Sequence, residues 1–180
     1  MKILIINASL SGSKTAKAIS SLKFSEEFTT EYINLKDLNM SFADGRDFRE
    51  YNNDNELIVN RMIEADAIVI ATPIFQASIP GVLKNLFDLL PINAISNKTV
   101  GTIITAGSSR HYLVAQQQLN PILNYLKTDL INKYVFLEGS DFTIDGISED
   151  ITMRLESLTK TIEDRVKDNK AKEKANYSFL

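Results

Sequence analysis

The chain contains no cysteine, no tryptophan and a single histidine, and only 4 prolines and 7 glycines occur among its 180 residues. Without cysteine there are no disulfides, thiol nucleophiles or thiolate metal ligands. The sequence is therefore compatible with a reducing compartment. Long hydrophobic runs are also missing, because the N-terminal run from Ile3 to Ile6 is far shorter than a signal-peptide core or a membrane span. We therefore expect a cytoplasmic protein with no membrane partner.

The chain also lacks a strong charge of either sign. Its 20 basic and 23 acidic residues give a formal net charge of -3, which argues against a nucleic-acid partner. With 44% hydrophobic and 24% charged residues, residues 1–180 suit a single globular domain. The charged run at 168–174 is expected to be a solvated helix end or part of a frayed tail at 168–180.

Apolar, strand-like runs alternate with segments of helical spacing. The expected strands are 2–6, 28–35, 67–72, 99–105 and 134–137. The expected helices begin near Ala16, after an Asp54 cap, near Pro80 with Ser78 as a plausible N-cap, near His111 and near Ser148. In the second helix, Leu57, Ile58, Met62 and Ile63 are expected on the apolar face. This alternation predicts an α/β fold with a flavodoxin-like, doubly wound, five-stranded parallel sheet and helices on both faces.

Two segments depart from this regular pattern. Pro121 has no N–H, so the carbonyl of Gln117 loses its helical partner, and we expect a kink or π-bulge in the helix predicted over 111–127. Residues 39–53 show no period, which predicts a long surface loop near the site or at a subunit contact.

Ligands of open parallel sheets bind beyond the carboxyl ends of the strands, near the point where the strand order reverses. The candidate binding elements are therefore the loops after the first, third and fourth expected strands. These loops span residues 7–15, 73–78 and 106–110.

The first loop, NASLSGSKT, is rich in hydroxyl groups and precedes a helix, whose first N–H groups favour an anion. Residues 1–25 contain four lysines and no acidic residue. These features predict phosphate binding by Ser9, Ser11, Ser13, Lys14 and Thr15. In the alternative interpretation, Ser13 only caps the helix and the other hydroxyls are surface groups. The loop is not a Walker A motif, because Ala8 and Ser13 stand where that motif requires glycine.

The second loop is uncharged and begins with Pro73, Ile74, Phe75 and Gln76. A rigid backbone beside an aromatic ring suits the wall of a site for a flat, mostly apolar ring system, and Gln76 is expected to offer a polar contact to the ring edge. Alternatively, Phe75 is an ordinary core residue and Pro73 an ordinary turn residue.

The third loop, AGSSRH, places Gly107, Ser108 and Ser109 where backbone amides can approach a ligand, and Arg110 is expected to complement a second anion. His111 is more typical of a surface or capping residue than of a catalyst. Because metal-ligand and hydrolase motifs are missing from the sequence, we expect no metal site and no catalytic side chain. A cofactor that carries the chemistry itself fits better.

The run PIFQASIPGVLKNLFD at residues 73–88 resembles the P-x-[YF]-x-x-S-x-x-G-x-L-K-x-x-x-D signature of the NAD(P)H-dependent FMN reductase family. Residues 107–123, GSSRHYLVAQQQLNPIL, are similar to the branch linked to alkanesulfonate monooxygenase. The resemblance covers about residues 1–140. It implies hydride transfer from C4 of NADPH or NADH to N5 of FMN, with no protein acid or base required.

By this resemblance, the first loop holds the FMN phosphate, while 73–76 and 107–110 border the isoalloxazine ring. Ser11 stands where relatives often carry arginine, which predicts weaker phosphate binding and readier FMN exchange. Gln117 stands where the sulfonate-linked reductases carry tyrosine. The family also implies a homodimer or homotetramer and a flavin-dependent monooxygenase as a possible partner. As a further hypothesis, Arg110 meets the 2′-phosphate of NADPH.

Two other functions stay open at this point. An FMN-bound quinone or azo-compound reductase would retain its flavin through turnover and reduce an added acceptor. A flavodoxin-like electron carrier would bind FMN without a nicotinamide reaction of its own, although such carriers are usually more acidic than this chain.

Overall fold

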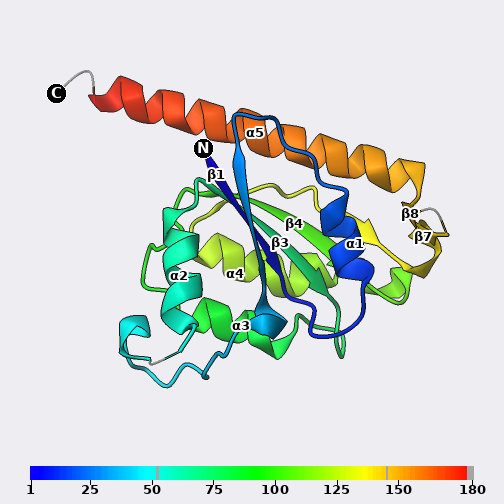
Figure 1. The fold of residues 1–180 in the computed structure, drawn as a ribbon, viewed down its shortest axis with the longest axis horizontal. Helices are drawn as coiled ribbons and strands as arrows, with labels where there is room; N and C mark the ends of the chain where they lie inside the picture. The colour runs from blue at the N-terminus through cyan, green and yellow to red at the C-terminus, as the bar shows by residue number, and fades with distance from the viewer. Residues whose placement is uncertain (52, 145, 178–180) are drawn as a thin grey trace.

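The apolar strands form one parallel sheet in the computed structural model, which describes residues 1–51, 53–144 and 146–177 (Figure 1). Its strands are β1 (Lys2–Asn7), β2 (Thr29–Asn34), β3 (Ala67–Pro73), β4 (Thr99–Thr105), β5 (Asp129–Leu130) and β6 (Val135–Leu137). Their order is β2-β1-β3-β4-β5, and β6 also pairs with β4. This is the flavodoxin-like doubly wound order, so the predicted fold class is confirmed.

Two short strands share the fifth position of the sheet. β5 pairs with Thr99 and Val100 of β4, and β6 pairs with residues 103–105 of the same strand. The N–H of Ile131 still donates to the carbonyl oxygen of Val100, at 2.9 Å, before the chain leaves the ladder. The expected strand at 134–137 is confirmed as β6. β5 was not predicted, because two residues are too few to show a period.

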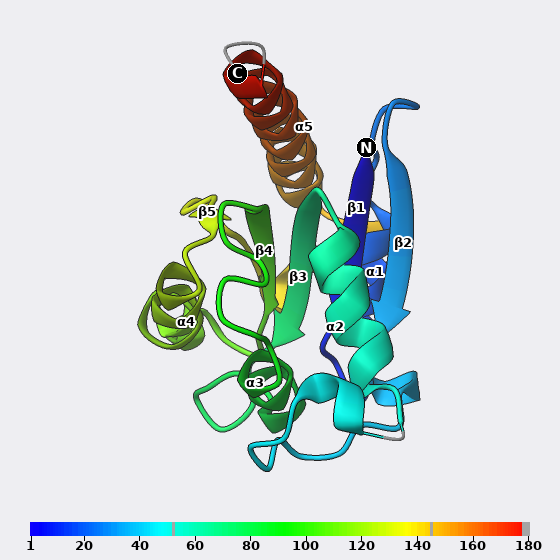
Figure 2. The same cartoon turned by 90° about the vertical axis from the view of Figure 1, so that its left-hand side faces the viewer.

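Helices cover both faces of this sheet (Figure 2). They are α1 (Lys14–Ser20), α2 (Asn55–Glu64), α3 (Gly81–Asp88), α4 (Asn120–Tyr125) and α5 (Glu149–Tyr177). Along β1, Leu4 and Ile6 join the buried cluster with α2, α3 and α4, whereas Ile3 and Ile5 join the cluster with α1 and α5. Because both faces are buried, the central strands are nearly continuous apolar runs.

The segment after the third loop is not the continuous helix that we expected over 111–127. It comprises the 3₁₀ turn η3 (Ser109–His111), the π-helix η4 (Ala115–Leu119) and then α4. Pro121 lies in the first turn of α4 and offers no N–H to the carbonyl of Gln117. The expected π-bulge is therefore confirmed, and the expectation of a single helix is wrong.

The start of α2 differs in part from the sequence expectation. Asp54 does precede the helix, but its carboxylate accepts a hydrogen bond from the N–H of Asn39 at 2.7 Å instead of capping α2. Leu57 and Ile63, which we placed on the apolar face, are 42% and 38% exposed. The buried face is formed by Ile58, Val59 and Met62, together with the amide of Asn55.

Residues 39–53 form the expected surface loop, because most of the described side chains are exposed, but the loop is also anchored to the core; residue 52 lies outside the described residues. The 3₁₀ turns η1 (Leu35–Asp37) and η2 (Phe48–Glu50) precede and interrupt this stretch. Phe48 and Tyr51 are buried in a small cluster against α2. In α3, Oδ1 of Asn85 accepts a hydrogen bond from the N–H of Ala43 at 2.8 Å, and its Nδ2 donates to the carbonyl of Ser41 at 3.0 Å. The Asn85 amide therefore anchors this loop to α3.

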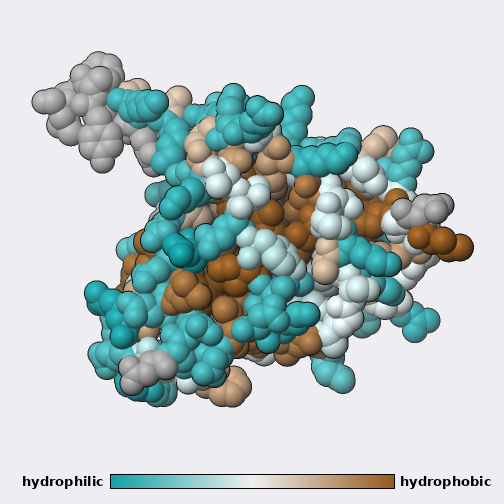
Figure 3. Space-filling view, viewed as in Figure 1, coloured by the Kyte–Doolittle hydropathy of each residue, from teal (hydrophilic) through white to brown (hydrophobic). Residues whose placement is uncertain are grey.

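The last part of the chain begins with the 3₁₀ turn η5 (Gly139–Asp141) and the hairpin of β7 (Phe142–Thr143) and β8 (Gly146–Ile147). α5 then runs along the sheet, and its outer side is largely hydrophilic in Figure 3. The helix continues through the charged run, so residues 168–177 form a helix end; residues 178–180 of the expected tail lie outside the described residues. Within the described part of the chain, no helix combines the length and the hydropathy of a membrane span.

Candidate functional site

The loops after β1, β3 and β4 meet at the carboxyl edge of the sheet, where the strand arrows of Figure 2 end. A cavity of about 400 Å³ opens between them. All five predicted residues of the first loop line it, together with Pro73, Ile74, Phe75 and Gly107. Gln76, Ser108, Ser109 and Arg110 lie outside this lining, so the structure brings most of the predicted site together and leaves these four at its border.

The first loop presents polar groups that its own helix does not use. Ser13 occupies the N-cap position of α1, yet its side chain makes no capping hydrogen bond. The first N–H groups of a helix have no intrahelical acceptor, and the backbone ladder here starts with Lys17 N–H donating to the carbonyl of Ser13 at 2.8 Å. Lys14 is exposed, and within the described residues it forms no ion pair. This arrangement offers hydroxyl, amide and ammonium donors to an anion.

Ser9 and Thr15 hold the first loop in place more than they offer donors to the cavity. Both are nearly inaccessible, with 4% and 2% of their surface exposed. The Ser9 hydroxyl donates to the carbonyl of Ser11 at 2.6 Å. The Thr15 hydroxyl lies 2.9 Å from that of Thr105 at the end of β4, which ties α1 to the sheet.

Asn7, at the end of β1, connects this loop to the neighbouring strand β2. Its Oδ1 accepts a hydrogen bond from the N–H of Ser9 at 3.1 Å, and its Nδ2 donates to Oδ1 of Asn34 at 2.8 Å. Asn7 is only 4% exposed. The path of the loop is therefore set by hydrogen bonds of the buried Asn7 side chain to the loop and to β2.

The second loop closes with a tight two-residue turn. Phe75 N–H donates to the carbonyl of Ser78 at 2.9 Å, and Ser78 N–H donates back to that of Phe75 at 3.0 Å. Gln76 and Ala77 have φ values of 48° and 58°, the signature of a type I′ turn, which favours Asn-Gly. Ser78 is therefore not the N-cap of α3, which begins at Gly81. The turn leaves Phe75 38% exposed at the cavity, with Gln76 beyond it.

The third loop turns back on itself soon after Gly107. Oγ of Ser108 accepts a hydrogen bond from the N–H of Arg110 at 3.3 Å, and the carbonyl of Ser108 accepts one from the N–H of His111 at 3.2 Å. These bonds form the turn η3 and place Ser108, Ser109 and Arg110 at the rim of the site.

An aromatic cluster supports the end of the third loop. The ring of Tyr112 lies 5.3 Å from those of Tyr134 and Phe136, measured between centroids. The Tyr134 hydroxyl donates to the carbonyl of Tyr112 at 2.5 Å. Burial, followed by the neighbouring Tyr112, raises the pKa of Tyr134 to about 12. The phenol therefore stays protonated, and able to donate this hydrogen bond, at pH values where an unperturbed tyrosine begins to ionise.

Three residues of the lining were not named as binding residues: Gly12 and Ala106, which lie within the predicted loops, and Thr105, which lies outside them. Gly12 has a φ of 78°, a conformation that glycine adopts without strain, and it lies between two predicted site residues. Thr105 is the last residue of β4 at the carboxyl edge, and Ala106 follows it. Extending the predicted loop back by one residue into the strand would have found Thr105, because strand ends are part of such sites.

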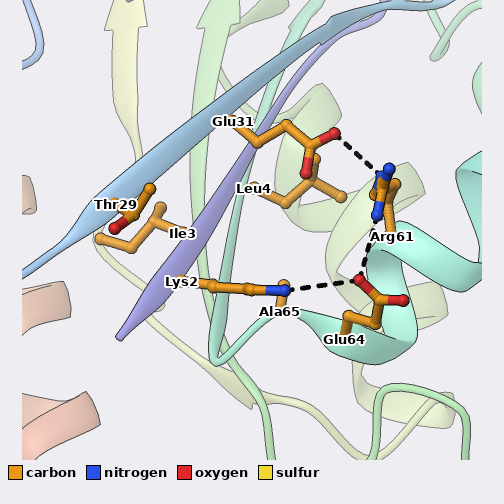
Figure 4. Close-up of a pocket in the computed structure, with 8 residues that line it drawn as sticks. All are labelled: Lys2, Ile3, Leu4, Thr29, Glu31, Arg61, Glu64 and Ala65. Carbon is orange, nitrogen blue, oxygen red and sulfur yellow. Dashed lines mark hydrogen bonds and ion pairs between the residues drawn. The ribbon is translucent and has the colours of Figure 1, made fainter.

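Two other hollows lack the features of this site. A cavity of about 70 Å³ lies at the amino ends of β1 and β2 (Figure 4), where Arg61 pairs with Glu31 at 3.0 Å and with Glu64 at 3.1 Å. It is small, and the charges around it are already paired. A groove of about 780 Å³ runs between α5 and residues 131–135, and no residue of the first loop lines it.

Comparisons with known proteins identify the family of this chain and proteins of similar fold. The family described as NADPH-dependent FMN reductase matches residues 1–142. The chain is 38% identical over 147 residues to the NAD(P)H-dependent FAD/FMN reductase of Geobacillus thermodenitrificans, an alignment that covers 79% of this chain and 80% of that protein. It is 39% identical over 77 residues to the FMN reductase (NADPH) of Escherichia coli, covering 43% of this chain and 40% of that protein. The apo form of an NADH:FMN oxidoreductase (EMOB) has a TM-score of 0.73 and 23% identity, with 93% of this chain and 89% of that chain covered.

Proposed function

The chain belongs to the NADPH-dependent FMN reductase family, and from this premise we propose that it catalyses hydride transfer from NADPH or NADH to FMN. We also propose that residues 1–180 act as a single flavodoxin-like FMN-binding domain. The observation that carries the proposal is the cavity at the carboxyl edge. There the first loop, which offers hydrogen-bond donors to an anion, faces the uncharged second loop and Gly107 of the third loop.

The residues of the cavity fit both parts of FMN, the phosphate and the isoalloxazine ring. The hydroxyls of Ser11 and Ser13, the first N–H groups of α1 and the Lys14 ammonium suit a phosphate. Pro73, Ile74 and Phe75 offer the rigid, mostly apolar surface that a flat ring requires.

Bound FMN supplies the hydride acceptor, and the chain supplies binding and orientation. Ser9 and Thr15 hold the phosphate loop through their buried hydrogen bonds. Gly107 lets backbone amides approach the ring, where donors stabilise developing negative charge. The described lining contains no carboxylate and no histidine, so we propose no catalytic acid or base. Gln76, Ser108, Ser109 and Arg110 form the border that the nicotinamide meets.

Anaerobic stopped-flow absorbance at the flavin band tests this proposal. The protein with stoichiometric FMN is mixed with NADPH and, separately, with NADH, and we expect rapid bleaching with at least one of them. With excess FMN, multiple turnovers identify FMN as a substrate. A single turnover followed by reduction of an added quinone or azo compound would favour the rival reductase, and bound FMN that is never bleached would favour an electron carrier.

The assembly and setting of the enzyme are further proposals. We propose a cytoplasmic homodimer or homotetramer that can pass reduced FMN to a flavin-dependent monooxygenase. Support for an interface comes from large apolar side chains at the surface: Leu113 is 52% exposed and Tyr125 is 84% exposed. Size-exclusion chromatography with light scattering tests the oligomer, and a monomer mass would contradict it.

A further inference from the structure

A hairpin that continues beyond the family match lies beside the phosphate loop. The match ends at residue 142, where β7 begins, and β7 pairs with β8 before α5 starts. Figure 1 shows this hairpin next to α1, at the N-terminal end of α5. Phe142 and Ile147 pack against the buried cluster that includes Ala18 and Ile19 of α1. The hairpin is therefore fixed to the helix that follows the phosphate loop.

Lys14 contacts this hairpin with its charged end. Its Nζ lies 5.4 Å from the centroid of the Phe142 ring, within the range of a cation–π interaction. The same nitrogen would lie 3.5 Å from a Cβ placed on Gly139. The ammonium thus rests between an aromatic face and the backbone of η5, while Lys14 remains part of the cavity lining.

The nearby acidic residues are occupied by their own turn. The carboxylate of Asp141 accepts a hydrogen bond from the N–H of Glu138 at 2.8 Å, and the Glu138 carboxylate completes a reciprocal capping box. Ser140 donates a further hydrogen bond to Glu138 at 3.1 Å. Within the described residues, Lys14 forms no ion pair with either carboxylate. The ammonium is held in place without being neutralised.

We propose that Phe142 is a positioning residue for phosphate recognition: its ring holds the Lys14 ammonium at the edge of the cavity for the phosphate of FMN. A lysine side chain has many rotamers, and holding it near its bound position lowers the entropic cost of binding. This inference rests on the proposed function and deepens it, because it makes the hairpin a determinant of the preference for FMN over riboflavin, which lacks the phosphate.

The test compares dissociation constants for FMN and riboflavin in Phe142→Leu and Lys14→Ala variants and in the double variant. Phe142→Leu removes the ring but keeps an apolar side chain. We expect it to weaken FMN binding about two- to five-fold and to leave riboflavin binding unchanged. Lys14→Ala should weaken FMN binding further, and adding Phe142→Leu to it should then have no additional effect. Phe142→Tyr keeps the ring and should keep the wild-type ratio.

A matched control is available at the opposite end of the sheet. Lys167 Nζ lies 5.7 Å from the ring of Phe28, so Phe28→Leu removes a similar contact far from the cavity and should leave the FMN-to-riboflavin ratio unchanged. If Phe142→Leu does not fold, Phe142→Met provides the same measurement.

Three results would overturn the inference: an equal loss for both flavins, no loss for FMN, or full additivity of the Phe142 and Lys14 substitutions. A wild-type protein that prefers FMN to riboflavin but reduces neither would refute the proposed reaction and leave the positioning role intact.

Discussion

At the scale of the residue, Tyr134 links the third loop to the sheet and makes stability depend on pH. Its pKa is about 12 in the folded chain, against about 10 for an unperturbed tyrosine. Between these values the unfolded chain releases the phenol proton while the folded chain keeps it. The contribution is therefore fully present below about pH 10 and is lost as the pH rises towards 12.

We expect the free energy of unfolding to fall more steeply between pH 9 and 11.5 in the wild type than in Tyr134→Phe, by up to about 1.4 kcal/mol per pH unit. Urea titrations at several pH values measure the free energy of unfolding of both proteins. Tyr125→Phe, at a side chain that is 84% exposed, is the control and should keep the wild-type slope. Equal slopes in the wild type and Tyr134→Phe would show that the folded-state pKa is not raised.

At the scale of the element, the second loop stores strain in two residues with positive φ. An alanine in this conformation costs roughly 1 to 2 kcal/mol, a cost that glycine avoids. Ala77→Gly should therefore stabilise the fold by about 0.5 to 1 kcal/mol in urea unfolding, after the added freedom of the unfolded chain is counted. Ala16→Gly is the control, because the same substitution within the helix α1 should have the opposite effect and destabilise the fold by about 1 kcal/mol. A loss of stability in Ala77→Gly would refute the strained turn.

The same loop shows where prediction from sequence ends. The strands could be predicted because a sheet covered on both faces needs continuous apolar runs, and the π-helix could be predicted because Pro121 removes a specific donor. The type I′ turn could not, because Gln76-Ala77 carries no turn signal, and so Ser78 was misplaced as an N-cap. Likewise, the burial of Phe48 within residues 39–53 depends on contacts with α2, which no local pattern records.

The candidate site divides in the same way. Its three loops followed from the strand ends, and Lys14 stood out through the local excess of lysine. The hydrogen bonds within the site could not be predicted from the sequence. The Thr15 hydroxyl, for example, pairs with that of Thr105, which lies 90 residues further along the chain. The contact between Lys14 and Phe142 is equally remote in sequence. Such partners depend on the folded arrangement and not on residue type.

At the scale of the whole molecule, α5 can lie close to the sheet because β4 has a glycine below it. A Cβ on Gly101 would lie 2.9 Å from Cδ1 of Ile162 and 3.1 Å from Cδ1 of Leu158, both of which are buried. Gly101→Ala should therefore destabilise the fold by about 1 to 3 kcal/mol through overpacking. Ile162→Val removes the nearest methyl group, so the double variant should be more stable than the sum of the two single effects predicts. Simple additivity in thermal or urea unfolding would contradict this packing.

The most direct test of the whole account is a crystal structure of the chain with FMN. We predict the phosphate against the donors of residues 11–15, with Lys14 within ion-pair distance, and the isoalloxazine ring between Pro73–Phe75 and Gly107 at the carboxyl edge. Flavin in the larger groove between α5 and residues 131–135, with the loop after β1 unoccupied, would contradict the account.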